Sequence, residues 1–298
     1  MDAVVLAGGI PRPDEPLYSY SNGQAKALID VAGKPMIQWV LDALGQSKSI
    51  DRVLVMGLSS KAELPCKKPI SYMSNQGKLL ENIKAGTARV LELNPQAEYV
   101  MIVSSDIPAV TGEMVDWLVK TCSESDDDLY YNVVRREDME RRYPGSRRTY
   151  TRLKDMEVCG GDMNVVRAAV VNENSDFWNK VFDSRKNPAG QAALLGPGII
   201  FKLLTRQLTA DDVIQEVASK LDLKGRAIVC PYPEIGMDVD KPHQLEIVRA
   251  DMQRRVRKAA SRPAGRSAKP KAKSAARKQV AAKPKARPAG KKSTRTKS

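Results

Sequence analysis

Near its beginning the chain carries Val4-Val5-Leu6-Ala7-Gly8-Gly9, a short apolar run followed directly by two glycines and then by a polar loop. The apolar residues predict a buried first strand over residues 3–7. Glycines at the carboxyl end of a strand let successive backbone N–H groups turn toward one point, and such a concavity binds phosphates and other anions. A plain tight turn has the same pattern, so this stretch alone leaves both interpretations open.

Strand-like runs and helix-length amphipathic segments alternate along the rest of the chain. The expected strands cover residues 3–7, 52–57, 99–103, 129–135, 163–171, 226–230 and 234–240. The expected helical segments cover residues 36–46, 78–94, 111–122, 175–222 and 241–257, and residues 136–157 form a polar, arginine-rich excursion. Such alternation predicts an α/β fold with a mainly parallel sheet flanked by helices.

The charge is distributed very unevenly. The 298-residue chain has a net charge of +14, but residues 252–298 hold 18 Lys or Arg and no Asp or Glu, so residues 1–251 carry −4. After Arg257 almost no large apolar residue occurs, and such a segment cannot bury enough surface to offset its chain entropy. We therefore expect a catalytic domain over residues 1–257 and a disordered basic tail over residues 258–298.

The tail resembles the carboxyl-terminal tails of linker histones in composition. Lysine and arginine neutralise phosphates without reading bases, so the tail is expected to bind nucleic acid or another polyanion nonspecifically. It has no aromatic residue, which excludes base stacking. A solubilising end with no dedicated partner remains the alternative.

Several classes of protein are disfavoured. The four cysteines are far apart and the chain has a single histidine, so zinc-ligand spacing is absent. Neither a GxGxxG fingerprint nor a GxxxxGK[ST] loop occurs. The first apolar run is too short for a signal-peptide core, and the longest apolar stretch, residues 192–204, is interrupted by Gly196-Pro197-Gly198. We expect a cytoplasmic protein with reduced thiols and no membrane contact.

The segment Lys26 to Ile37 reads KALIDVAGKPMI. Together with the Gly8-Gly9 loop it resembles the opening of the MobA-like NTP transferases, a group that includes sugar-phosphate nucleotidyltransferases and molybdenum-cofactor guanylyltransferases. Their pattern is LAGG, a loop with an arginine, a lysine, and GKP before a helix. The resemblance implies a GT-A type, Rossmann-like fold with a nucleotide half first and an acceptor half second.

The resemblance also implies roles for particular residues. Arg12 and Lys26 would be catalytic residues that neutralise charge at the reacting phosphorus, although the loop from Gly9 to Pro13 departs from the usual G-x-S-x-R-M-G. The nucleotide would be bound by Leu6, Ala7, Gly8, Gly9, Lys26 and Gly77. The alternative for Lys26, and the favoured one for Lys34, is a solvated surface lysine.

Asp106 follows the apolar run of residues 99–103 in the stretch Val103 to Pro108. A carboxylate at the carboxyl end of a central strand lies where open α/β sheets bind ligands, and it can hold Mg²⁺ against phosphate oxygens. The resembled family has C-D-x-P or G-D-x-P here, which implies a metal-binding and catalytic Asp106. A helix N-cap is the structural alternative.

The stretch from Ile235 to Leu245 resembles the family segment D-x-D-T-P-E-D-L, which implies a second metal contact at Asp240 or Asp238. On a strand over residues 234–240 these two side chains would face the same way and could converge on one cation. Lys241 replaces the usual threonine, and His243 and Gln244 replace an acidic pair. His243 is expected to be a partly exposed helix residue.

Two further segments point to the acceptor. Cys159 to Asn164 reads CGGDMN and resembles a T-G-G-N segment, which implies acceptor binding by Gly160, Gly161 and Asn164. Residues 185–188 resemble an R-K-x-P stretch, which implies that Lys186 reaches an acceptor phosphate. An ordinary glycine turn and a solvated helix start are the alternatives.

The implied activity is transfer of a nucleoside monophosphate from an NTP to a phosphorylated small molecule with Mg²⁺ as cofactor and release of pyrophosphate. A phosphate nucleophile is already ionised at neutral pH, so a chain with one histidine can catalyse this reaction without a general base. Two alternatives remain. One is a GT-A glycosyltransferase in which Asp238-Val239-Asp240 serves as the D-x-D motif, and the other is a non-catalytic nucleotide-binding protein anchored to nucleic acid by its tail.

Overall fold

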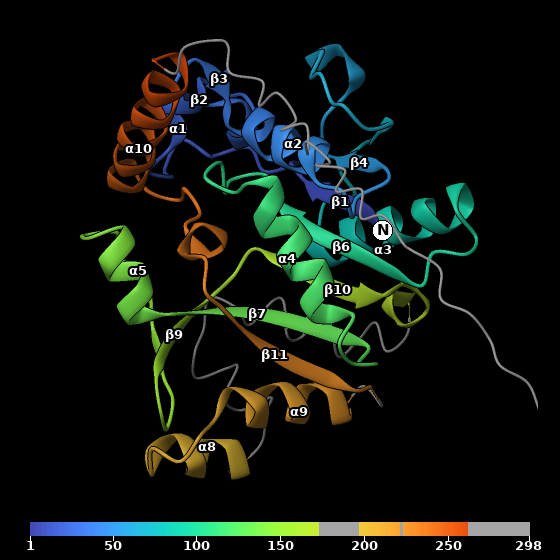
Figure 1. Ribbon diagram of the computed structural model, residues 1–298, viewed down its shortest axis with the longest axis vertical. Helices are drawn as coiled ribbons and strands as arrows, with labels where there is room; N and C mark the ends of the chain where they lie inside the picture. The colour runs from blue at the N-terminus through green and yellow to red at the C-terminus, as the bar shows by residue number, and fades with distance from the viewer. Residues whose placement is uncertain (173–196, 221–222, 262–298) are drawn as a thin grey trace, which may run out of the picture. The chain divides into compact units, whose positions relative to one another are not determined.

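A mixed sheet of nine strands lies at the centre of the described part of the chain, which comprises residues 1–172, 197–220 and 223–261 of this computed structural model (Figure 1). The strands lie in the order β5-β4-β1-β6-β10-β7-β9-β8, and β11 pairs with β7. They are β1 (Asp2–Leu6), β4 (Val53–Met56), β5 (Ile70–Met73), β6 (Tyr99–Ser104), β7 (Leu129–Arg135), β8 (Thr151–Arg152), β9 (Glu157–Gly160), β10 (Met163–Arg167) and β11 (Gly225–Cys230). Strands β9 and β10 run antiparallel to the other strands of the sheet, which all share one direction. The sheet is therefore mixed but mainly parallel, and the predicted α/β fold is confirmed.

The order of the strands creates a switch point between β1 and β6. The chain passes from β1 outward to β4 and β5, and then returns to place β6 on the other side of β1. Ligands of open α/β sheets bind at the carboxyl ends of the strands at such a point. Gly8 and Asp106 follow β1 and β6, so both lie at this edge of the sheet.

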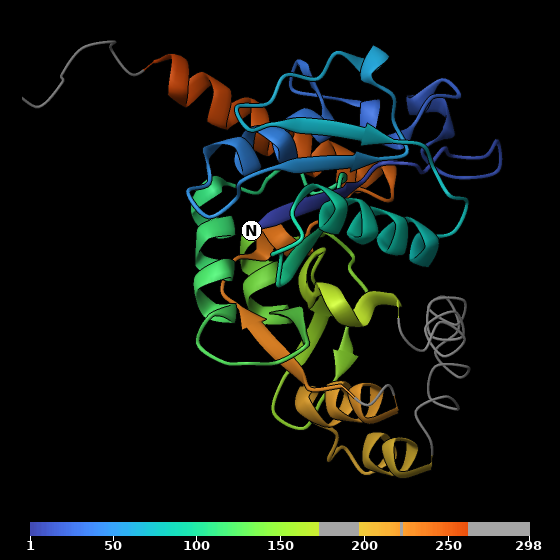
Figure 2. The same ribbon diagram turned by 90° about the vertical axis from the view of Figure 1, so that its right-hand side faces the viewer.

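Helices cover both faces of the sheet. The core on one face includes residues of α2 (Met36–Gln46), α4 (Gly112–Cys122) and α10 (Pro242–Ala260), while α3 (Leu79–Leu93) packs on the other face. Figure 2 shows α3 and α4 on opposite sides of the central strands. Strand β1 is therefore buried on both faces, as its almost continuous apolar sequence predicts.

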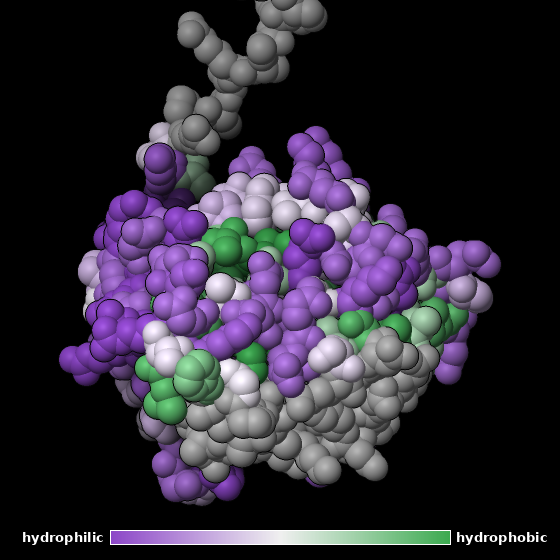
Figure 3. All heavy atoms as spheres, turned by 90° about the horizontal axis from the view of Figure 1, so that it is seen from below, coloured by the Kyte–Doolittle hydropathy of each residue, from purple (hydrophilic) through white to green (hydrophobic). Residues whose placement is uncertain are grey.

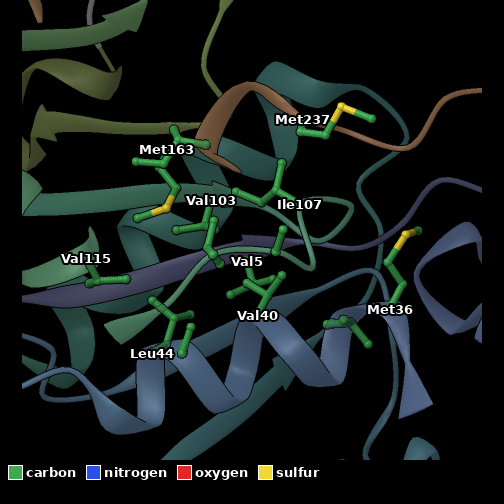
Figure 4. Packing of buried hydrophobic residues seen from close by; sticks show 14 of the residues in the cluster. Val5, Met36, Val40, Leu44, Val103, Ile107, Val115, Met163 and Met237 are labelled. Atoms are coloured by element: carbon green, nitrogen blue, oxygen red, sulfur yellow. The ribbon is translucent and has the colours of Figure 1, made fainter. Parts of the chain in front are cut away.

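Alternate side chains of β1 enter different cores. Val5 packs in the larger core with Val40 and Leu44 of α2 (Figure 4), whereas Val4 packs in the smaller core with Val90 of α3. All five side chains are nearly or completely buried. Because successive residues of a strand point to opposite faces, every apolar residue of this run contributes to holding the carboxyl end of β1 in place.

The remaining described elements are short. The hairpin β2-β3 is formed by Asp30–Val31 and Lys34–Pro35. The other described α-helices are α1 (Tyr18–Ser21), α5 (Arg136–Arg142), α8 (Pro197–Leu204) and α9 (Ala210–Lys220). The expected polar excursion over residues 136–157 thus contains α5 and β8 and reaches the start of β9. Of the expected helical block over residues 175–222, the described part contains α8 and α9, and the rest lies outside the described residues.

Two strand predictions need correction. Residues 163–171 were expected to form one strand, but β10 ends at Arg167 and Ala168–Asn172 form a 3-10 turn that packs against α3. The strand expected at residues 234–240 is wrong, because Pro233–Gly236 form a 3-10 turn and the following residues are irregular. Pro233 has no N–H to donate to a neighbouring strand, and the carbonyl of Ile235 accepts a hydrogen bond from the amide of Asp162 at 2.9 Å instead.

Residues Met1–Ala259 form one compact unit. The predicted tail lies almost entirely outside the described residues, so its disorder and its boundary at residue 257 stay predictions. No helix in the described ranges is both long and apolar enough to cross a membrane. In the view of Figure 3, polar side chains occupy most of the coloured surface, and apolar atoms are confined to separate patches.

Candidate active site

The loop after β1 is built on close backbone approaches. Gly57 has a φ of +95°, and a Cβ atom at this position would overlap the backbone of Gly8. The Asn75 amide donates to the carbonyl of Gly8 at 3.0 Å, and the amide of Lys26 donates to the carbonyl of Gly9 at 2.8 Å. The loop is therefore held from two sides, by the segments that follow β4 and β5 and by the segment that carries Lys26.

Lys26 is the central cation of the site. Its Nζ lies 2.5 Å from Oδ2 of Asp106 and 2.6 Å from Oδ1 of Asp240, and 21% of its side chain is exposed. Burial alone would lower the pKa of Lys26, but Asp106 and Asp240 outweigh it and raise that pKa above its ordinary value. Lys26 is thus a charged group between two carboxylates, and the alternative of a solvated surface lysine is wrong.

Asp106 lies in the turn after β6, two residues beyond the end of the strand at Ser104. Its Oδ1 accepts a hydrogen bond from the Ser104 hydroxyl at 2.6 Å, and its carbonyl accepts one from the amide of Val239 at 3.0 Å. The N-cap alternative is wrong, because helix α4 begins six residues later and has Thr111 at its N-cap. The contact with Val239 also brings the irregular segment of Asp238 and Asp240 to the end of β6.

The expected convergence of three carboxylates is present. Asp106, Asp238 and Asp240 each place one carboxylate oxygen within 4.8 Å of the others. Strand alternation is not the cause, because residues 237–241 are irregular. The buried Oε1 of Gln244 accepts from the amides of Asp240 and Lys241, both at 2.9 Å, and this clamp holds the segment in place. The metal-binding role of the cluster stays a prediction.

Arg148 was not among the residues expected in the site. Its guanidinium forms an ion pair with Asp238, and 14% of its side chain is exposed. The arginine-rich excursion signalled a functional segment, but no feature of the sequence separates Arg148 from the exposed Arg147 beside it. The half-buried guanidinium of Arg148 gives the site a second positive charge in addition to that of Lys26.

Asp162 was not among the expected site residues either. Burial, and then the charge of Asp106, raise its pKa to about 7, while the positive charge of Arg148 acts in the opposite direction. Asp162 therefore belongs to the same electrostatic cluster. The sequence signal was its position inside the CGGDMN stretch, between the two glycines and the asparagine that were expected to bind the acceptor.

The CGGDMN stretch is folded back on β7. The amide of Gly161 donates to the carbonyl of Asn132 at 2.8 Å, and the side chain of Asn164 accepts from the amide of Asn132 at 2.8 Å and donates to the carbonyl of Gly161 at 3.1 Å. Gly160 ends β9 and pairs with Val133. The amide of Asn164 is thus engaged with the backbone, and these contacts position the turn that carries Asp162.

Gly77 lies in a loop that reaches back to Gly8. Its φ is +90°, and its amide donates to Oδ1 of Asn75 at 2.9 Å. Asn82 completes this network, because its amide donates to Oδ1 of Asn75 at 2.9 Å and its oxygen accepts from the amide of Gln76 at 2.8 Å. Asn75 and Asn82 were not predicted, although two asparagines flanking a Gln-Gly pair are a usable signal for a hydrogen-bonded loop.

Other predicted residues lie apart from the carboxylate cluster. The Arg12 side chain is 70% exposed and pairs with Asp14 and Glu15 of its own loop at 3.6 and 3.4 Å, so the structure does not bring it to Lys26. Lys34 pairs with Asp42 at 2.6 Å, as a surface lysine would.

The remaining predicted residues lie at the end of β1, in helix α10 or outside the described residues. Leu6 ends β1 and Ala7 follows it, and the carbonyl of Leu6 accepts a hydrogen bond from the amide of Ser105 at 3.2 Å. The predicted acceptor residue Lys186 lies outside the described residues. His243 is half-buried, and its Nε2 lies 3.1 Å from the carbonyl of Ser146.

Residues 3–199 match the family model of the MobA-like NTP transferase domain. The chain therefore belongs to this family of nucleotidyltransferase enzymes, and the resemblance inferred from the sequence is confirmed.

Solved structures with the same fold include a hypothetical transferase from Thermus thermophilus, which is 29% identical with a TM-score of 0.70 over 82% of this chain and 98% of that one. CMP:2-keto-3-deoxy-manno-octonic acid synthetase complexed with CTP is 15% identical, with a TM-score of 0.54 over 85% and 98% of the two chains. A 4-diphosphocytidyl-2C-methyl-D-erythritol synthase is 12% identical, with a TM-score of 0.51 over 84% and 97%. Among curated proteins, no match to this chain is found.

Proposed function

We propose that the chain transfers a nucleoside monophosphate from an NTP to a phosphorylated small molecule and releases pyrophosphate. The observation that carries this proposal is the position of Lys26, whose ammonium lies between Asp106 and Asp240 at the carboxyl ends of β1 and β6. The Gly8-Gly9 loop adjoins it through the hydrogen bond from the Lys26 amide to Gly9. A cation, backbone amides and clustered carboxylates at a switch point are the groups that phosphoryl chemistry requires.

Each half of the chain would bind one substrate. The amides of Gly8 and Gly9 and the ammonium of Lys26 would bind the phosphates of the NTP, with Leu6, Ala7 and the Gly77 loop alongside. Arg12 would join them after leaving Asp14 and Glu15. The acceptor would bind near Gly160, Gly161, Asn164 and Lys186. One of its phosphate oxygens attacks the α-phosphorus in line, the bond between the α-phosphorus and the bridging oxygen breaks, and pyrophosphate carries the electron pair away.

The site suits a magnesium ion. Asp106, Asp238 and Asp240 offer oxygen ligands within 4.8 Å of one another, and hard divalent cations prefer carboxylate oxygens. These three side chains would hold the ion, which when bound would neutralise and orient the phosphate oxygens. Lys26 keeps its own charge beside the developing negative charge, and the ionised acceptor phosphate makes a general base unnecessary.

The direct test is pyrophosphate release from each of the four NTPs with Mg²⁺ and a panel of sugar phosphates, polyol phosphates and molybdopterin. CTP belongs in the panel because a structural neighbour is complexed with it. Asp106→Asn should lower the rate roughly 10²–10³-fold, because it removes one preorganised charged group. Asp155→Asn, an exposed carboxylate outside the cluster, should retain full activity. An active Asp106→Asn enzyme would contradict the assignment.

A glycosyltransferase is the second candidate, favoured by one observation: Asp238 and Asp240 of the D-x-D stretch do converge with Asp106. The two functions release different products. Free nucleoside diphosphate from a sugar nucleotide would support the glycosyltransferase, and binding of an NTP without turnover would support a non-catalytic nucleotide-binding protein.

For the tail we propose nonspecific binding to nucleic acid or another polyanion, supported by the 15 Lys or Arg and no Asp or Glu in residues 258–298. Counterion release makes such binding steeply salt-dependent. The full chain should be retained on DNA at low salt and released at high salt, while a chain truncated after Arg257 should not be retained. Equal retention of the two chains would remove this proposal.

A further inference from the structure

Arg148 has no role in the function proposed above, yet it lies inside the carboxylate cluster. It pairs with Asp238, whose carboxylate converges with those of Asp106 and Asp240. Its Nε is buried without a hydrogen-bond partner. The guanidinium is therefore held within the cluster while part of its donor capacity is unused.

The backbone that carries Arg148 is held firmly. Arg147 has a φ of +51°, a left-handed conformation that reverses the chain before Arg148. The carbonyl of the buried Ser146 accepts a hydrogen bond from Nε2 of Gln244 at 3.3 Å, and Nε2 of His243 lies 3.1 Å from the same oxygen. Because Gln244 also holds the amide of Asp240, one side chain ties the Arg148 segment to the carboxylate segment.

The charges of the cluster do not balance. Three carboxylates meet here, those of Asp106, Asp238 and Asp240. Lys26 and Arg148 are the cations paired with them. With all five groups ionised, the cluster carries −1, and a bound divalent cation would bring it to +1. Asp238 cannot serve such an ion fully while it is paired with a guanidinium.

We propose that Arg148 is a phosphate-binding residue that occupies Asp238 only while no divalent cation is bound. The inference rests on the function proposed above. When an ion takes Asp238, its double charge repels the guanidinium, which then pairs with a substrate phosphate beside the cluster. Arginine suits this exchange because it keeps its charge and its planar fork binds phosphate oxygens in pairs. The source of the phosphate is either the triphosphate of the NTP or the acceptor.

The first test measures the metal alone. Mn²⁺ binding to the full chain is followed by electron paramagnetic resonance for the wild type, Arg148→Gln and, as a control, Arg147→Gln, which removes an equal charge from an exposed neighbour. Arg148→Gln should bind Mn²⁺ about tenfold more tightly, since a competing cation is gone, and Arg147→Gln should match the wild type. Unchanged or weaker binding by Arg148→Gln would overturn the proposal, because a purely structural arginine would only orient Asp238.

The second test measures phosphate at saturating Mn²⁺, with inorganic tripolyphosphate and inorganic phosphate as probes. Arg148→Gln should lose at least about tenfold in affinity for one of them. Loss of tripolyphosphate assigns Arg148 to the NTP, and loss of inorganic phosphate assigns it to the acceptor. Wild-type affinity for both would overturn the proposal.

Folding is checked by thermal unfolding. If Arg148→Gln does not fold, Arg148→Lys replaces it: the charge is kept, so Mn²⁺ binding should equal that of the wild type, while phosphate binding should still weaken because the fork is lost. Wild-type phosphate binding by Arg148→Lys would then overturn the proposal. Neither readout needs turnover, so a failure of the proposed transferase activity would be seen separately.

Discussion

The two halves of the described chain place their site residues by different means. In the first half, residues 1–106, Gly8 and Asp106 each lie two residues after the end of a regular strand, β1 and β6 respectively. In the second half, residues 107–261, the site residues lie on turns and irregular segments, among them Arg148, Asp162 and Asp240. Regular strands align their own ends, whereas irregular segments need individual hydrogen bonds to be held.

Buried amide side chains supply those bonds in the second half. Asn132 is completely buried, and its side-chain amide donates to the carbonyl of Met163 in the CGGDMN stretch. Gln244, which is 2% exposed, bonds to the segments of Ser146 and Asp240. A buried backbone N–H or carbonyl without a partner costs about 1–3 kcal/mol. The Gln244 amide satisfies three such groups and the Asn132 amide satisfies one. The site residues of the first half are therefore positioned by backbone packing, and those of the second half by a few polar side chains.

The largest expected effect concerns the shared cation, Lys26, which joins the two halves through Asp106 and Asp240. Lys26→Met should lower kcat/KM for pyrophosphate release roughly 10²–10³-fold, because a preorganised charge at the phosphates is lost. Lys34→Met is the matched control, since Lys34 pairs with Asp42 on the surface and should be replaceable within about twofold. Comparable rates for the two variants would show that Lys26 belongs to the fold and not to the chemistry.

Backbone packing in the first half is tested at Gly57. Gly57→Ala should lower the free energy of unfolding by about 3 kcal/mol, because alanine is strained at a φ of +95° and its Cβ would overlap Gly8. Urea unfolding measures the loss. Gly9→Ala is the control, because no atom lies within 4 Å of a Cβ placed there. A Gly57→Ala chain as stable as Gly9→Ala would refute the close approach.

The smaller effect on stability is expected at Gln244. Gln244→Leu leaves the amides of Asp240 and Lys241 and the carbonyl of Ser146 without this partner, at a cost of about 2 kcal/mol. It should also lower activity, because both the Asp240 and the Arg148 segments lose their clamp. Gln253→Leu, an exposed change on the same helix, should do neither. Loss of stability with full activity would show that Gln244 does not position the site residues of the second half.

The α/β fold, the family and the groups near the ends of strands could be predicted from the sequence alone. Apolar runs identify buried strands, and residues shortly after parallel strands share one edge of the sheet, so Asp106 could be named from local pattern and resemblance. Lys26, which lies on a 3-10 turn, was named from the resemblance. Asp238 and Asp240 were also named, although the strand predicted to align them does not form.

Which polar residues of the second half lie in the carboxylate cluster depends on the tertiary structure. Arg148 and the exposed Arg147 are chemically identical, and a left-handed turn together with the Gln244 clamp selects one of them. Arg12 was predicted for the site and instead pairs within its own loop. The physical reason is that irregular segments are placed by contacts with residues far away in the chain, and those contacts leave no periodic signal in the sequence.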